Sequence, residues 1–224
     1  MSTSDLDYLR ELVLFSEMDD DELLEINDMI KTTTYPGGYT LFFQGDEGKR
    51  VFFLKEGKVK VLKTTEDGSE QILEILQPGD VFGEVVLFGI NNYPATARTM
   101  EDIKVNFLNR DDFKEYFNKN PQIAWGMLKV MAQKLAKAQH RIENLGLRNT
   151  KGRVARLIMD LLDEFGDKQD EFVLDISQSD LANFIGTSRE TVSRTLSEFR
   201  KKDLLKMTDN KIIINDLDGL KNYL

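Results

Sequence analysis

The stretch Ser177-Gln-Ser-Asp-Leu-Ala-Asn-Phe-Ile-Gly-Thr-Ser-Arg-Glu-Thr-Val-Ser-Arg-Thr-Leu-Ser-Glu-Phe199 predicts two helices joined by a sharp turn. The first helix covers residues 177–186 and ends at Gly186, because glycine can adopt the left-handed backbone that such a turn needs. The second helix covers residues 187–199 and carries an apolar stripe at helical spacing. The stripe consists of Val192, Leu196 and Phe199. A helix-turn-helix is therefore expected here.

Polar side chains near the start of the second helix lie off this stripe. Helix-turn-helix proteins insert that end of the helix into the major groove of DNA. Arginine can donate to guanine, glutamate can accept from cytosine, and serine can meet a base or a phosphate. The predicted base-reading residues are Ser188, Arg189, Glu190, Ser193 and Arg194. The predicted phosphate contacts are Ser179, Thr187, Thr191, Lys201 and Lys202.

Some of these side chains have a structural alternative. Glu190 follows Thr187 by three residues, so the two could form a capping box without any base contact. Arg200, Lys201 and Lys202 could be a solvated helix end that interacts with the helix dipole. A helix-turn-helix can also serve protein contacts only, but the placement of the arginines argues against that use.

The distribution of charge is compatible with DNA binding although the chain has a formal net charge of -9. Residues 148–224 carry 13 Lys and Arg against 14 Asp and Glu, whereas residues 1–147 carry 17 against 25. Basic side chains supply most of the sequence-independent affinity for DNA. The acidic excess therefore lies outside the predicted DNA-binding region.

The N-terminal part of the chain changes pattern at about Lys31. The first thirty residues read as helical, with a helix start at Asp19-Asp20-Asp21. Residues 31–109 consist of short alternating runs separated by glycines, which predicts a compact antiparallel β domain. Within it, Glu66-Asp67-Gly68-Ser69 predicts a hairpin, with Asp-Gly supplying positive φ angles.

A heptad pattern follows this domain. Its apolar positions alternate intervals of three and four residues, which predicts pairing with the same helix of a second subunit. The predicted dimer seam is Leu128, Met131, Leu135, Ala138, Ile142 and Leu145. The alternative is that this stripe packs on its own β domain, a role that the second apolar line of Ile123, Met127 and Val130 could fill instead.

The C-terminal part begins after a predicted hinge at residues 145–152, where Asn149-Thr150 can cap the next helix. A helix at 153–164, a strand at 172–176, and a strand pair at 204–207 and 211–214 with an Asp209-Asn210 turn predict a winged helix-turn-helix. The expected domains are residues 1–118 (β sensor domain), 119–148 (dimerisation helix and hinge) and 149–224 (DNA-binding domain).

The run Ile185-Gly-Thr-Ser-Arg-Glu-Thr-Val-Ser-Arg-Thr-Leu196 resembles the recognition region of the cyclic-AMP receptor protein and fumarate-nitrate regulator (Crp/Fnr) family. Gly79-Asp-Val-Phe-Gly-Glu-Val-Val-Leu-Phe88 resembles the cyclic-nucleotide-binding β-roll of that family, and the heptad helix resembles its dimer helix. The resemblance implies an α+β fold: an N-terminal antiparallel β-roll with flanking helices, a long dimerisation helix and a C-terminal winged helix-turn-helix. It also implies a homodimer on a palindromic double-stranded DNA site with TGTGA-like or TTGAT-like half-sites, and contact with RNA polymerase.

The predicted sensor region departs from the family pattern. Pro94 and Ala95 stand where nucleotide-binding members carry Arg and Ser, and Ala138 and Gln139 replace the hydroxyl pair that meets the adenine. A buried phosphate needs a paired cation and several donors. We therefore expect that this chain does not bind cyclic AMP. The possible effector pocket consists of Gly83, Glu84, Ala95, Thr96 and Arg98. Two of these residues have a structural alternative. Glu84 could be a turn carboxylate bonded to local amides, and Arg98 could lie on the face of a strand.

The residue inventory excludes several other classes. The chain has no cysteine, so no disulfide or cysteine-ligated iron-sulfur cluster is expected, and a single histidine, His140, makes haem or a cupin metal centre a poor expectation. No catalytic set and no metal site is apparent, so no enzyme is expected. Without an apolar run of about 20 residues or a signal peptide, the chain is expected in the cytoplasm and not in a membrane. Two alternatives remain: a small-effector-binding protein, and a constitutive regulator whose β-roll serves only as a dimer scaffold.

Overall fold

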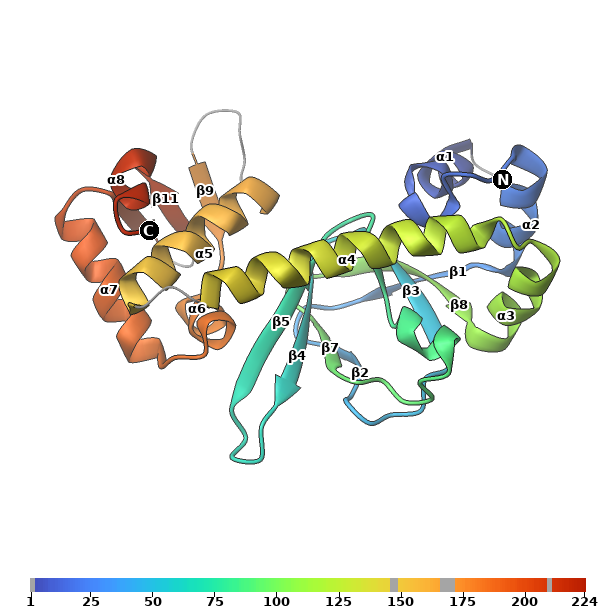
Figure 1. Cartoon of the computed structure of the whole chain (residues 1–224), viewed down its shortest axis with the longest axis horizontal. Helices are drawn as coiled ribbons and strands as arrows, with labels where there is room; N and C mark the ends of the chain where they lie inside the picture. The colour runs from blue at the N-terminus through green and yellow to red at the C-terminus, as the bar shows by residue number, and fades with distance from the viewer. Residues whose placement is uncertain (1–2, 146–148, 166–171, 209–210) are drawn as a thin grey trace. The chain divides into compact units, whose positions relative to one another are not determined.

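The computed structural model describes residues 3–145, 149–165, 172–208 and 211–224. The chain forms two compact units (Figure 1). The first unit contains Met1–Ser69 and Leu73–Ala136, and the second contains Glu70–Ile72 and Lys137–Leu224. None of the helices in the described part of the chain combines the length and apolarity that a bilayer span requires.

The first unit is built on two four-stranded sheets that together form the predicted antiparallel β-roll. One sheet has the strand order β1-β8-β3-β6 and the other has the order β2-β7-β4-β5. The strands are β1 (Lys31–Tyr35), β2 (Thr40–Phe42), β3 (Arg50–Glu56), β4 (Val59–Thr64), β5 (Glu70–Leu76), β6 (Val81–Phe82), β7 (Thr96–Thr99) and β8 (Ile103–Asn109). The paired strands for which a register is available run antiparallel, with β1, for example, pairing Lys31 with Phe107.

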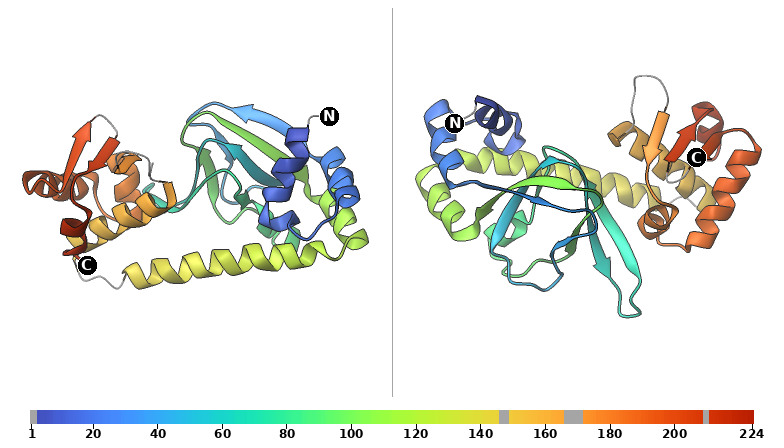
Figure 2. Two further views of the ribbon diagram at one scale, coloured as in Figure 1. Left: turned by 90° about the horizontal axis from the view of Figure 1, so that it is seen from above. Right: turned by 180° about the vertical axis from the view of Figure 1, so that it is seen from behind.

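Helical segments precede and follow the roll in the sequence, and one short helix lies within it, between β6 and β7. They are α1 (Thr3–Glu11), η1 (Val13–Phe15), α2 (Asp20–Met29), η2 (Glu84–Phe88), α3 (Arg110–Lys119) and α4 (Ile123–Leu145). The predicted helix start at Asp19 is confirmed, because Asp19 and Glu22 form a reciprocal capping box. Figure 2 shows the first half of α4 running along one side of the roll.

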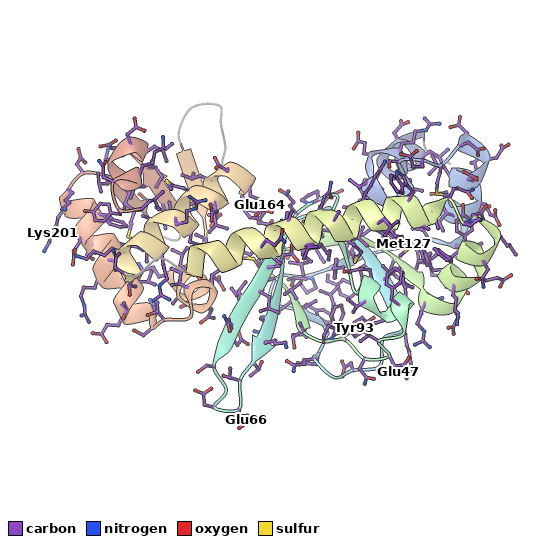
Figure 3. All side chains as sticks on the ribbon, viewed as in Figure 1. Glu47, Glu66, Tyr93, Met127, Glu164 and Lys201 are labelled. Atoms are coloured by element: carbon purple, nitrogen blue, oxygen red, sulfur yellow. The ribbon has the colours of Figure 1, made fainter. Side chains whose placement is uncertain are left out.

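The hairpin between β4 and β5 is confirmed, but its turn differs from the prediction. The backbone N–H of Thr65 donates to the carbonyl of Ser69 (2.9 Å), which closes a loop with Glu66 at its tip (Figure 3). Gly68 has a φ of 83°, whereas Asp67 does not have a positive φ. Only Gly68 therefore uses the left-handed region, because this longer loop needs a single residue of that kind.

The second unit is the predicted winged helix-turn-helix. Its elements are α5 (Thr150–Phe165), β9 (Phe172–Asp175), α6 (Gln178–Ile185), α7 (Arg189–Lys201), β10 (Leu205–Thr208), β11 (Lys211–Ile214) and α8 (Leu217–Lys221). Asn149 caps α5 as expected, since its Oδ1 accepts from the N–H of Gly152 (2.6 Å). The sheet order is β10-β11-β9. Helix α8 was not predicted, and the expected Asp209-Asn210 turn and the middle of the expected hinge lie outside the described residues.

Candidate nucleic-acid interface

The turn between α6 and α7 has the geometry that a helix-turn-helix requires. Ser177 caps α6, with its Oγ accepting from the N–H of Asp180 (3.0 Å). Gly186 has a φ of 71°, and its N–H donates to the carbonyl of Ala182 (2.9 Å). The N–H of Thr187 donates to the same carbonyl (3.0 Å), so the last turn of α6 is closed as the chain enters α7.

Helix α7 presents its predicted base-reading side chains away from the core. The apolar stripe is buried as expected, and Thr195 lies buried beside it. Ser188, Arg189, Glu190 and Arg194 are exposed, and Ser193 is half-buried. The predicted set thus lies near the N-terminal end of one exposed helix face.

The N-terminus of α7 overturns the capping-box alternative for Glu190. Ser188 is the N-cap, and its Oγ accepts from the N–H of Thr191 (3.1 Å). Because the helix begins at Arg189, two residues after the predicted start, Thr187 is not the cap. The Glu190 carboxylate instead accepts from the guanidinium of Arg194, one turn later (2.9 Å). An exposed pair of this kind contributes little to stability, but it orients both side chains on the outer face of the helix.

The predicted phosphate-contacting residues occupy different environments. Ser179, Lys201 and Lys202 are exposed, while Thr187 and Thr191 are half-buried. Lys201 extends outward from the end of α7 (Figure 3). Lys202 donates to the hydroxyl of Tyr223 (2.7 Å), and this hydrogen bond raises the pKa of Lys202. Lys202 is therefore held beside Tyr223, two residues after the end of α8.

Further cations of the second unit were not predicted from the sequence. Lys206 on β10 and Lys211 on β11 are exposed on the wing. The sequence pattern could have predicted their exposure, since each lysine is the neighbour of a buried wing residue and successive strand residues point to opposite faces. Lys151 also forms an ion pair with Glu198 of α7, and this hydrogen bond lowers the pKa of Glu198.

The two apolar lines of helix α4 lie in different environments, which the sequence had not decided. Ile123, Met127 and Val130 are buried in the core of the roll. Of the predicted seam, Leu128 is 60% exposed and Leu135 is 61% exposed. The alternative that the seam packs on its own β domain is therefore wrong for these two leucines.

The other predicted seam residues differ in their exposure. Met131 is half-buried and contacts the core, and Ala138 is exposed. Ile142 and Leu145 belong to α4, but their side chains and that of His140 lie outside the described residues. Trp125, three residues before Leu128, is 58% exposed and extends the apolar face toward the start of α4. Trp125 lies outside the heptad positions, but its helical interval of three residues from Leu128 is visible in the sequence.

The predicted sensor residues lie in η2 and β7 or, for Gly83 and Ala95, immediately before these elements. Gly79 and Gly83 have φ values of 97° and 74°, which confirms them as turn glycines. Ala95 is buried, and the Oγ1 of buried Thr96 accepts from the N–H of Gln44 (2.9 Å). Arg98 lies on strand β7, as its alternative predicted, with its Nε 3.3 Å from the hydroxyl of Thr40.

Glu84 has a different partner from the one expected. Its side chain is only 7% exposed, and its carboxylate lies 3.0 Å from the Nζ of Lys134 on α4. The alternative of a turn carboxylate bonded to local amides is therefore wrong, because the cation comes from fifty residues away in sequence. No group of three or more metal-ligating side chains occurs within the described ranges.

Comparisons with known proteins match both units. Residues 32–120 match the cyclic nucleotide-binding domain, and residues 152–223 match the Crp-like helix-turn-helix domain. The chain is 26% identical over 210 residues to a CRP-like cAMP-activated global transcriptional regulator of Mycobacterium tuberculosis, covering 92% of this chain and 94% of that protein. It is 30% identical to the cyclic AMP receptor protein of Thermus thermophilus, covering 81% and 82%. A solved structure of a CRP/FNR family transcriptional regulator from the same organism has a TM-score of 0.73 at 26% identity, covering 86% of this chain and 97% of that one.

Proposed function

Because the chain belongs to the Crp/Fnr family of transcription regulators, we propose that it binds a palindromic DNA site as a homodimer, with each α7 reading one half-site. The observation that carries this proposal is the exposed face at the start of α7. Arg189, Glu190 and Arg194 lie there together, and Ser188 holds the first turn in place. These side chains offer donors for guanine and an acceptor for cytosine.

We propose a half-site of the TGTGA or TTGAT type, because α7 resembles the recognition region of the family at the residues that face outward. The ion pair between Glu190 and Arg194 places an acceptor beside a donor fork one helical turn apart. Neighbouring base pairs that contain guanine and cytosine would meet both groups. Ser193 adds a short hydroxyl on the same stretch of helix. We propose that the wing lysines Lys206 and Lys211 contact phosphate.

The exposed face of α4 supports the proposal of a homodimer. Trp125, Leu128 and Leu135 are each more than half exposed on a single helix, an arrangement typical of an unpaired coiled-coil surface. Trp125 is the only tryptophan of the chain. Its fluorescence should therefore shift to shorter wavelength as protein concentration rises, and Leu135→Glu should abolish the shift. An unshifted spectrum across concentrations at which the protein sediments as a dimer would place the interface elsewhere.

We further propose that cyclic AMP does not control this protein, although relatives are named for that ligand. Pro94 offers neither a charge nor an N–H, and Ala95 is a buried apolar residue. Glu84 is already paired with Lys134. The roll then either takes another effector or serves a constitutive regulator. Calorimetry with cyclic AMP up to millimolar concentrations should show no binding heat, and a micromolar dissociation constant would contradict this proposal.

Selection from random duplexes tests the DNA-binding proposal directly. Repeated rounds with the full-length protein should enrich a palindrome whose half-sites lie about one helical turn apart, roughly 34 Å. Arg189→Ala should then weaken the selected duplex by about 1–3 kcal/mol more than a scrambled duplex. Arg200→Ala, an exposed arginine at the other end of α7, is the matched control and should weaken both duplexes equally. An equal loss for both duplexes with Arg189→Ala would exclude its base-reading role.

The same duplex allows the proposed polymerase contact to be tested. We propose that the DNA-bound dimer acts in the cytoplasm by contacting RNA polymerase. Transcription in vitro from promoters carrying the selected site at different distances from the start should rise or fall with position. No change at any position would contradict the polymerase contact while leaving DNA binding intact.

A further inference from the structure

Glu84 is the one buried carboxylate in the described part of the chain, and it sits in a tightly defined segment. Helix η2 is five residues long and lies between Gly83 and Gly89, which both adopt the left-handed conformation with φ values of 74° and 88°. Glu84 is the first residue of this helix, and both ends of the helix are turns whose backbone conformation glycine adopts readily. A carboxylate buried there requires a partner cation, because an unpaired buried charge is very costly.

Helix α4 supplies that cation from the end of its roll-facing line. Ile123, Met127 and Val130 fill the core, and Lys134 follows Val130 by four residues on the same side of the helix. The Lys134 Nζ lies 3.0 Å from the Glu84 carboxylate, and its side chain is 29% exposed. The apolar contacts of α4 with the roll are thus followed, one turn later, by a largely buried ion pair.

The exposed apolar face of α4 runs beside this ion pair. Leu135 is the next residue after Lys134, and Met131 lies three residues before it. An ion pair that fixes the rotation and depth of α4 at Lys134 also fixes the direction in which Leu135 projects. Buried ion pairs are better suited to specifying one arrangement than to adding stability, because burying the two charges costs much of the attraction between them.

We propose that Lys134 is a positioning residue, which clamps α4 onto the roll through Glu84 and so sets the direction of the exposed face of α4 without any bound ligand. The effect of this clamp on DNA binding rests on the proposed function, because the exposed face of α4 is the proposed dimer seam. The clamp itself is a local property of α4 and η2.

Hydrogen exchange of α4 tests the clamp in the full-length protein. Lys134→Met keeps the aliphatic stem and removes the charge, so it leaves Glu84 buried and unpaired. Exchange in the α4 peptide spanning residues 128–139 should accelerate by about 100-fold, the scale expected when a buried charge loses its partner. Lys129→Met is the matched control, because Lys129 pairs with Glu17 at the surface of the same helix. It should leave exchange in this peptide unchanged.

The double variant Glu84→Gln/Lys134→Met separates positioning from stability. Neither charge is then left alone, so the melting temperature should return close to that of the parent protein. The exchange of α4 and the dimer dissociation constant should stay raised by about tenfold, because the interaction that orients the helix is absent. A double variant that matches the parent in both measurements would refute the positioning role, as would parental exchange in Lys134→Met.

The outcome also separates this proposal from the proposed function. If α4 responds as described while the parent protein enriches no palindrome, the proposed function fails and the clamp stands. If the parent protein binds a palindrome while exchange in α4 ignores both variants, the clamp alone fails.

Discussion

Gly126 on α4 lies against the backbone of η1, and replacing it by alanine tests how closely these segments approach. A Cβ at position 126 would lie 1.9 Å from the carbonyl oxygen of Leu14 and 2.6 Å from its carbonyl carbon. An ordinary contact begins at 3.4 Å, so η1 would have to move by about 1.5 Å or α4 would have to shift. Neither movement is easy, because η1 carries Leu14 and Phe15, which are fully buried in the core.

The expected loss follows from two opposing terms. Alanine is favoured over glycine inside a helix by about 1 kcal/mol. Overpacking of a close-packed core costs about 1–3 kcal/mol, and the upper end applies here because backbone atoms, not the end of a side chain, meet the new methyl group. Gly126→Ala should therefore lower the free energy of unfolding by about 2 kcal/mol, and the melting temperature by roughly 4–8 °C.

Urea unfolding followed by circular dichroism and by Trp125 fluorescence measures this loss. Ala132→Gly, at an exposed position of the same helix, is the control for helix propensity alone and should cost about 1 kcal/mol. If Gly126→Ala is as stable as the parent protein or more stable, the close passage of η1 over α4 is wrong.

Three further predictions concern the second unit. Ser188→Ala removes the N-cap of α7 and should lower the free energy of unfolding by about 1 kcal/mol in urea titrations, whereas an unchanged midpoint would mean that Thr191 does not depend on this cap. Gly186→Ala should cost about 1–2 kcal/mol in thermal melts, and the cost should come from the positive φ alone because no atom lies within 4 Å of the added methyl group; a neutral result would argue against the left-handed turn. Glu198 has a lowered pKa in the folded state, so its contribution to stability is present above its ordinary pKa and is lost as the pH falls through the lowered value. Lys151→Ala should return the pKa of Glu198 toward the ordinary range in carboxyl NMR titrations. An unchanged pKa would exclude the ion pair as the cause.

Most of the fold followed from local patterns in the sequence. The helix-turn-helix was predicted from a glycine between two amphipathic runs, and the helix start at Asp19 from a run of acids before an apolar segment. One error concerned the end of a helix. The start of α7 was placed two residues early, because Thr187 and Ser188 are both good caps and only the backbone geometry decides between them.

The candidate sites divide in the same way. The exposed set on α7 was predicted because its members and the buried stripe belong to one helix with a period of 3.6 residues. The hydrogen bond between Lys202 and Tyr223 was not predicted, since the two residues lie 21 positions apart and meet only when Tyr223, beyond the end of α8, packs on Phe199 of α7. The separation of the two lines on α4 was left open by the sequence, because both lines are apolar and both have helical spacing.

The sequence alone determined most of the helices and strands, which helix face is apolar, and which family the chain resembles, because these properties depend on residues within a few turns of one another. The tertiary structure decided which apolar line of α4 enters the core and which cation reaches Glu84. Lys134 and Glu84 are fifty residues apart, and several lysines are available in the chain. Only the folding of α4 onto the roll brings this particular lysine within 3.0 Å of the buried carboxylate, because the choice depends on packing between distant elements and not on spacing along the chain.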